Sequence, residues 1–323
     1  MPQDRLASLR DRFGGAALHP LTLTVSPGRA GTLFLCAWLQ ENCPGQAIVT
    51  HEGVSHRVAR PGTFFRPFDE AAMQEALAHD PLYEWLGELL GQAAEQPVVE
   101  TGHYAISAIP IVQAIAPQAL RVLLLHRHPV ASAGSHAIKG HYRDHHNPAW
   151  AIYPTHPRAR FPEYQSRWDA MTPYECELYR WLETTAYGLE LAERFPNTPH
   201  RVAAAGDLFT SVDTRRELAR FFGLEPAADE VVSGRGQNAT IDRNRELRPI
   251  GEEWRRTTDH TEVVALAESL GYDMDKATIQ REAAKYLRPP GVMPLVRRVT
   301  GYWHARWWLG KTKKRLLAGS DSS

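Results

Sequence analysis

Five short runs of aliphatic and β-branched residues, separated by helix-like stretches, constrain the fold of this 323-residue chain more than any other feature. Strands that are joined through helices pair in parallel, because each crossover returns the chain to the same end of the sheet. We therefore predict an α/β fold with three layers, in which helices cover both faces of a central parallel sheet. The predicted strands are Leu21–Val25, Ala47–Thr50, Val98–Val99, Leu120–Leu125 and Val202–Ala205.

Leu120–Leu125 is the longest continuous aliphatic run, which predicts that this strand lies at the centre of the sheet. Helical periodicity is seen between the strands, and Pro81 interrupts the second helical stretch. The predicted helices are Thr32–Leu39, Glu70–Ala94 with its break, Ile106–Ala116, Tyr174–Phe195, Thr214–Phe222 and Val263–Leu270.

The chain is 43% hydrophobic, enough for one large domain that we place at residues 1–290. Residues 141–173 are rich in His, Pro, Arg and Trp without a regular period, which predicts a lid or acceptor loop. Residues 291–323 form a basic extension that contains Trp303, Trp307 and Trp308. Packing on the domain is the simplest prediction for this extension, and weak contact with a membrane surface is the alternative.

The charge balance, the cysteine content and the N-terminal sequence bear on the class of protein. Lys plus Arg and Asp plus Glu both number 37, so the overall charge gives no reason to expect a nucleic-acid partner. The three cysteines, Cys36, Cys43 and Cys176, fit neither a paired-cysteine metal site nor a disulfide framework. The first twenty residues lack the apolar core of a secretion signal, which predicts a cytoplasmic protein.

A glycine-containing loop follows the first predicted strand and precedes its helix. At this position, backbone N–H groups and the helix dipole attract anions. The candidate anion-binding residues are Ser26, Gly28, Arg29, Ala30, Gly31 and Thr32. A nucleotide-hydrolysing P-loop carries Lys before the hydroxyl residue, where this chain has Gly31, which argues against a P-loop-like small-molecule kinase.

A second candidate anion site follows the fourth predicted strand. The strand is predicted to end at Arg127, and Pro129 favours the start of a helix. Arg127 and Ser135 are then expected to converge on one anion at the carboxyl edge of the sheet.

Taken together, these two segments resemble the sulfotransferases that use 3′-phosphoadenosine 5′-phosphosulfate (PAPS). The first loop is similar to the 5′-phosphosulfate loop of that family, and Arg127 with Ser135 is similar to its 3′-phosphate site. With looser similarities, the resemblance to the family covers roughly residues 20–275. The looser similarities are Trp181, Asp207-Leu208 and Arg216–Leu224. Asn238, Trp254 and Leu270-Gly271-Tyr272 resemble the bacterial members in particular.

The resemblance implies a P-loop NTPase-like fold, PAPS as co-substrate and no metal. The implied reaction moves a sulfuryl group to a hydroxyl or amine of a small-molecule, lipid or carbohydrate acceptor. Arg29 is then expected to stabilise the transferring group, and the general base is expected at Glu52, with His51 as second choice and His103 as a further candidate. A non-catalytic nucleotide-binding module of the same fold remains the alternative.

The chain departs from the family pattern at a few positions. His128 stands where many members carry an acidic residue, and Ala204 and Gly206 stand where an Arg or Tyr and a Glu commonly precede Asp-Leu. The histidines around the second site have no fixed metal-ligand spacing, so we predict that they line or cover an anionic site. They are His126, His128, His136, His141, His145 and His146.

Overall fold

The computed structural model describes residues 4–53, 65–142, 151–232 and 250–287. The predictions for Asn238, for His145 and His146, and for the extension 291–323 lie outside these residues. Within the described part, no helix combines the length and the apolar character needed to cross a bilayer.

Five parallel strands form one sheet in the order β2-β3-β1-β4-β5, so the predicted α/β class and parallel sheet are confirmed. The predicted strand positions agree with the structure to within one or two residues. The strands are β1 (Leu21–Val25), β2 (Ile48–Thr50), β3 (Val98–Glu100), β4 (Leu120–His126) and β5 (His200–Ala204).

The prediction that the strand at Leu120–Leu125 is central was wrong, because β1 takes the central place and β4 lies beside it. The sequence of β1 alternates Leu with Thr, which concealed how deeply it is buried. Thr22 and Thr24 are nevertheless fully buried, so both faces of β1 are covered.

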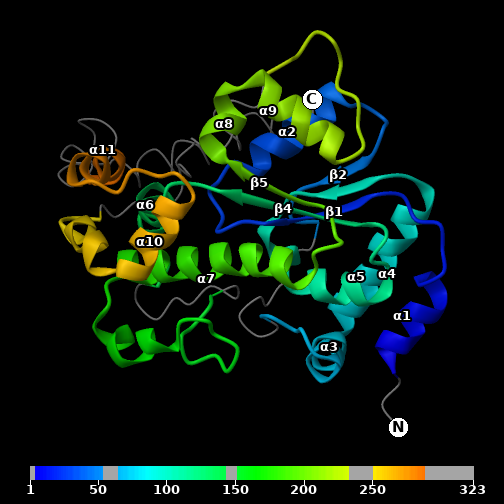
Figure 1. The fold of residues 1–323 in the computed structure, drawn as a ribbon, viewed down its shortest axis with the longest axis horizontal. Helices are drawn as coiled ribbons and strands as arrows, with labels where there is room; N and C mark the ends of the chain where they lie inside the picture. The colour runs from blue at the N-terminus through cyan, green and yellow to red at the C-terminus, as the bar shows by residue number, and fades with distance from the viewer. Residues whose placement is uncertain (1–3, 54–64, 143–150, 233–249, 288–323) are drawn as a thin grey trace, which may run out of the picture.

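Helices cover both faces of the sheet (Figure 1). On one face lie α2 (Thr32–Asn42), α8 (Ala205–Thr210) and α9 (Val212–Phe221), packed on Leu123 and Leu125 of β4. On the other face, Val122 and Leu124 of the same strand join the larger core. That side contains α1 (Arg5–Phe13), α3 (Glu70–Leu77), α4 (Asp80–Glu95), η1 (His103–Ala108), α5 (Ile109–Ile115), α6 (Pro129–Ala137) and α7 (Pro173–Arg194).

The remaining elements are η2 (Pro162–Ala170), η3 (Glu253–Asp259), α10 (Thr261–Ser269) and α11 (Lys276–Leu287). Part of the segment predicted as a loop between residues 141 and 173 is therefore helical. Tyr164 of η2 is fully buried, which makes this portion part of the core. That the rest of the segment covers a ligand stays a prediction.

Three α-helices were not predicted: α1, α8 and α11. In α1 and α11, at least half of the residues are charged or polar. α1 buries Leu6, Leu9 and Phe13, and α11 buries Ile279 and Ala283. These spacings of three or four residues are the signature of one apolar helix face. They could have been detected in the sequence despite the surrounding charge.

Candidate active site

The carboxyl ends of the parallel strands lie at one edge of the sheet, and the candidate residues are gathered there. From β1, the chain passes first to β2 and β3, which lie on one side of β1. It then passes to β4 and β5, which lie on the other side. Such a change of direction at a central strand is where open α/β sheets bind ligands.

The loop after β1 has the backbone of an anion-binding turn. Gly28, Arg29 and Gly31 all adopt positive φ angles, of 75°, 57° and 91°. The N–H of Gly28 donates to Ser26 Oγ at 3.1 Å, which stabilises the turn. Gly31 is the N-cap residue of α2. Because glycine has no side chain, it offers no side-chain acceptor to the N–H groups of the first helical turn.

The predicted residues of the two anion sites lie side by side. Arg29 Nε donates to Ser135 Oγ at 2.9 Å, and Arg127 Nη1 donates to the backbone oxygen of Arg29 at 3.1 Å. Burial and the charge of Arg127 lower the pKa of Arg29. An anion bound between the two guanidinium groups would reduce the electrostatic repulsion between them.

Other elements hold Arg127 in place. Trp181 of α7 donates from its indole to the backbone oxygen of Arg127 at 2.8 Å. His128, the departure from the family pattern, caps α6 by accepting from the N–H of Val130 at 3.3 Å. Burial raises the pKa of Tyr286 of α11, and the charges of Arg127 and Arg29 oppose this rise, so Tyr286 interacts with both arginines.

The three candidate bases also come together, at the ends of β2 and β3. Glu52 Oε1 lies 3.5 Å from His103 Nδ1 and 3.7 Å from His51 Nε2. Burial lowers the pKa of His51 to about 4 and contributes most to lowering that of His103 to about 3. Both histidines are therefore neutral at pH 7.

The hydroxyl group of Thr101 defines the tautomer of His51. Thr101 Oγ1 donates its single hydrogen to the backbone oxygen of Thr50 at 3.0 Å, and it lies 3.2 Å from His51 Nδ1. His51 Nδ1 must then carry the proton in this contact. The lone pair of His51 is consequently on Nε2, the atom that faces Glu52.

Glu100, at the end of β3, is a site residue that the sequence did not reveal. Its side chain is almost fully buried and accepts four hydrogen bonds. Oε1 accepts from the N–H groups of Glu52 and Gly102, at 2.9 and 2.6 Å, and Oε2 accepts from the N–H of Gly53 and from Thr50 Oγ1, at 3.1 and 2.8 Å. This carboxylate holds Glu52 in its positive-φ conformation of 57°.

The Glu100→Gln variant is expected to unfold more readily, by about 3 kcal/mol, because its NH₂ group would face two donors that then lose their acceptor. Thermal denaturation followed by circular dichroism measures this as a fall of several degrees in Tm. The exposed Glu95 provides the matched control, since Glu95→Gln should leave Tm unchanged. Equal Tm values for both variants would contradict the role given to Glu100.

Arg180 of α7 was also missed. It is 2% exposed, and a Cβ atom placed on Gly28 would lie 3.8 Å from its Nη1. The same Cβ would lie 3.0 Å from His136 Nε2, so Gly28 leaves room for both side chains beneath the loop. No spacing in the sequence connects residue 180 with residue 28.

Comparisons with known proteins found similarity to this chain among solved structures only. No family model matches the sequence, and no curated protein matches it either. Three solved structures align with 81% of this chain.

One is a sulfotransferase from Alicyclobacillus acidocaldarius, 17% identical with a TM-score of 0.45, covered over 99% of its length. Another is the sulfotransferase domain of the Synechococcus PCC 7002 olefin synthase, 14% identical with a TM-score of 0.42, covered over 98%. The third is the sulfotransferase domain of the curacin biosynthetic pathway, 13% identical with a TM-score of 0.42, covered over 100%. Likeness at this level does not assign an activity to this chain.

Proposed function

We propose that this protein is a sulfotransferase that moves a sulfuryl group from PAPS to a hydroxyl or amine of a small-molecule, lipid or carbohydrate acceptor. The observation that supports the proposal best is the pairing of Arg29 and Arg127 at the carboxyl edge of the sheet. PAPS carries phosphate on both sides of its ribose, so it needs two neighbouring cationic groups. AMP and similar nucleotides would satisfy only one of them.

The 5′-phosphosulfate would bind to the loop residues 26–32, close to the N-terminus of α2. Arg29 stays protonated, so it would stabilise the charge that develops on the bridging oxygen rather than donate a proton. Arg127 would bind the 3′-phosphate. Ser135, which accepts from Arg29 in this structure, would bind either group depending on how the Arg29 side chain turns.

The reaction is a direct displacement at sulfur. The acceptor oxygen or nitrogen forms a bond to sulfur while the bond between sulfur and the bridging oxygen of the phosphate breaks. The products are the sulfated acceptor and adenosine 3′,5′-bisphosphate, and the acceptor proton passes to Glu52 or to one of its two histidine neighbours. The transfer needs no metal ion in this scheme.

Transfer of radioactive sulfate from PAPS to a pooled panel of sugars, phenols, amines and lipid head groups tests the proposal. A sulfated product, identified by its mass, is the expected result, together with tight binding of adenosine 3′,5′-bisphosphate in calorimetry. Turnover of ATP that depends on Mg²⁺ would instead identify a kinase. Equal affinity for AMP and for the bisphosphate would contradict the proposal, whichever acceptors are tried.

A further inference from the structure

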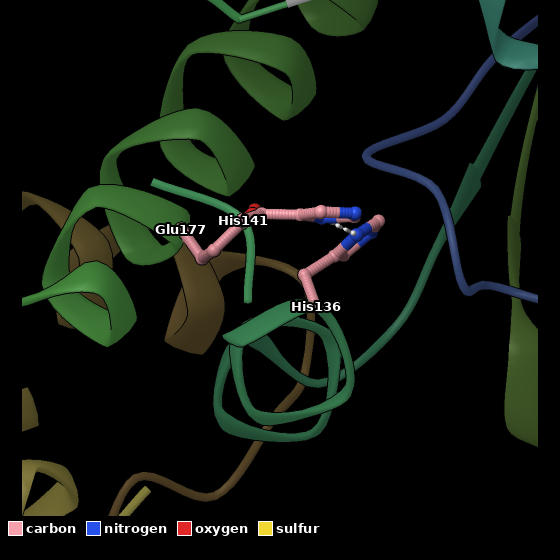
Figure 2. A group of neighbouring side chains, drawn as sticks. All are labelled: His136, His141 and Glu177. Carbon is pink, nitrogen blue, oxygen red and sulfur yellow. Dashed lines mark hydrogen bonds and ion pairs between the residues drawn. The ribbon is translucent and has the colours of Figure 1, made fainter. Parts of the chain in front are cut away.

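Three side chains with metal-binding atoms converge beneath the loop that follows β1. His136 lies on α6, Glu177 lies on α7, and His141 lies in the turn that follows α6. One ligand atom from each residue lies within 4.8 Å of the other two. Figure 2 shows the imidazole rings of the two histidines turned toward each other.

Two of the separations between these atoms match those of a metal centre. His136 Nδ1 lies 3.2 Å from His141 Nδ1, which in turn lies 3.4 Å from Glu177 Oε1. In a tetrahedral zinc site with bonds of about 2.1 Å, neighbouring ligand atoms lie about 3.4 Å apart. Two imidazole nitrogens and a carboxylate oxygen are also a ligand set that zinc prefers.

The surroundings prepare these groups to act as ligands. Arg180 donates from Nε to Glu177 Oε2 at 2.6 Å, which orients the carboxylate and leaves its Oε1 directed at His141.

The turn after α6 sets the position of His141. Gly140 adopts a left-handed φ of 82°, which turns the chain back toward α7 after the helix ends. The side chain of His141 is only 12% exposed, and that of Glu177 is not exposed at all. The cluster is thus a buried, formed arrangement of groups from three segments.

We propose that His136, His141 and Glu177 bind one divalent transition-metal ion, with Zn²⁺ as the preferred ion. Three protein ligands leave one position of a tetrahedral ion open, as in zinc sites that bind a water molecule or an anion. His136 adjoins Gly28 of the anion-binding loop, so this site borders the proposed sulfuryl-transfer site and extends it. Metal binding itself requires no nucleotide, so it is independent of the proposed function.

The sequence concealed this site because its third ligand is distant in the chain. His136 and His141 are five residues apart, and Glu177 follows only after another 36. The family resemblance implied no metal, and the histidines, which have no fixed ligand spacing, were predicted to line or cover an anionic site. Packing of α7 against α6 adds the carboxylate that completes the ligand set.

Titration of the chelator-treated full-length protein with Co²⁺, without nucleotide, tests the proposal. The expected result is one Co²⁺ ion per chain with the visible absorption bands of a low-coordinate complex, and displacement of these bands by Zn²⁺. His141→Ala and Glu177→Gln should each weaken binding by ~100-fold or more, because each removes a direct ligand. The exposed His19 provides the control, and His19→Ala should bind Co²⁺ like the unmodified protein.

Two results would overturn the proposal. One is the absence of bands with the unmodified protein, which would leave the three groups as a hydrogen-bonded cluster. The other is equal Co²⁺ affinity in all variants, which would place the ion elsewhere. Binding of adenosine 3′,5′-bisphosphate, measured separately by calorimetry, shows whether the proposed function fails independently of the metal site.

Discussion

Arg127→Ala is expected to weaken binding of adenosine 3′,5′-bisphosphate by about 10- to 100-fold, which corresponds to the loss of hydrogen bonds to a charged group. Binding of AMP should change little, because AMP lacks the 3′-phosphate that Arg127 would hold. Calorimetric titration of both nucleotides measures the two affinities. The expected signature is thus a loss of discrimination between the nucleotides, with binding of AMP retained.

Two further variants make this experiment specific. Arg220, an exposed residue of α9, provides the control for removal of an arginine, so Arg220→Ala should leave both affinities unchanged. Arg29→Ala should weaken both nucleotides, because Arg29 lies in the loop that would bind the 5′ group. If Arg127→Ala weakened AMP and the bisphosphate equally, Arg127 would not be the 3′-phosphate residue.

Glu52→Gln is expected to lower kcat by 10²- to 10⁴-fold, the usual contribution of a general base, while the affinity for adenosine 3′,5′-bisphosphate stays the same. Glutamine keeps the shape of the side chain but cannot take up the acceptor proton. The measurement is the rate of sulfate transfer from PAPS to the acceptor found in the panel. Glu88→Gln, at an exposed position of α4, is the control and should transfer at the normal rate.

The histidine neighbours of Glu52 are expected to matter less. With pKa values lowered to about 4 and about 3, His51 and His103 are weak bases, and we infer that His103, whose Nδ1 lies 3.5 Å from Glu52 Oε1, orients Glu52. His51→Ala and His103→Ala should therefore lower kcat by less than Glu52→Gln. A larger effect of His51→Ala would make its Nε2 the base, and unchanged transfer in all three variants would exclude this cluster from catalysis.

The position of much of the candidate site could be predicted because residues that follow parallel strands lie at one edge of the sheet. Once Leu21–Val25, Ala47–Thr50 and Val98–Val99 were recognised as strands, Arg29, Glu52 and His103 had to follow them at the same edge of the sheet. The start of α6 at Pro129 was likewise predicted, since proline favours the first turn of a helix. Local sequence determines these features because they depend on residues close together in the chain.

The interactions that complete the site could not be predicted in this way. Glu100 resembled any other acidic residue after a strand until the folded chain placed four donors around it. Arg180 and Glu177 lie on a long helix whose sequence gives no sign that it passes beneath the loop after β1. The order of the strands, with β1 at the centre, was also decided by packing, because two threonines on β1 are buried against the layer that contains α2.

The sequence by itself determined the strands, most of the helices and the two segments with anion-binding character, since these follow from hydrophobic periodicity and from the conformational preferences of glycine and proline. Only the tertiary structure decided that Arg29 and Arg127 adjoin, that Glu100 fixes Glu52, and that His136, His141 and Glu177 converge. The physical reason is distance along the chain. Contacts between residues 36 to 98 positions apart form only when strands pair and helices pack together, and a pattern of neighbouring residues carries no record of that arrangement.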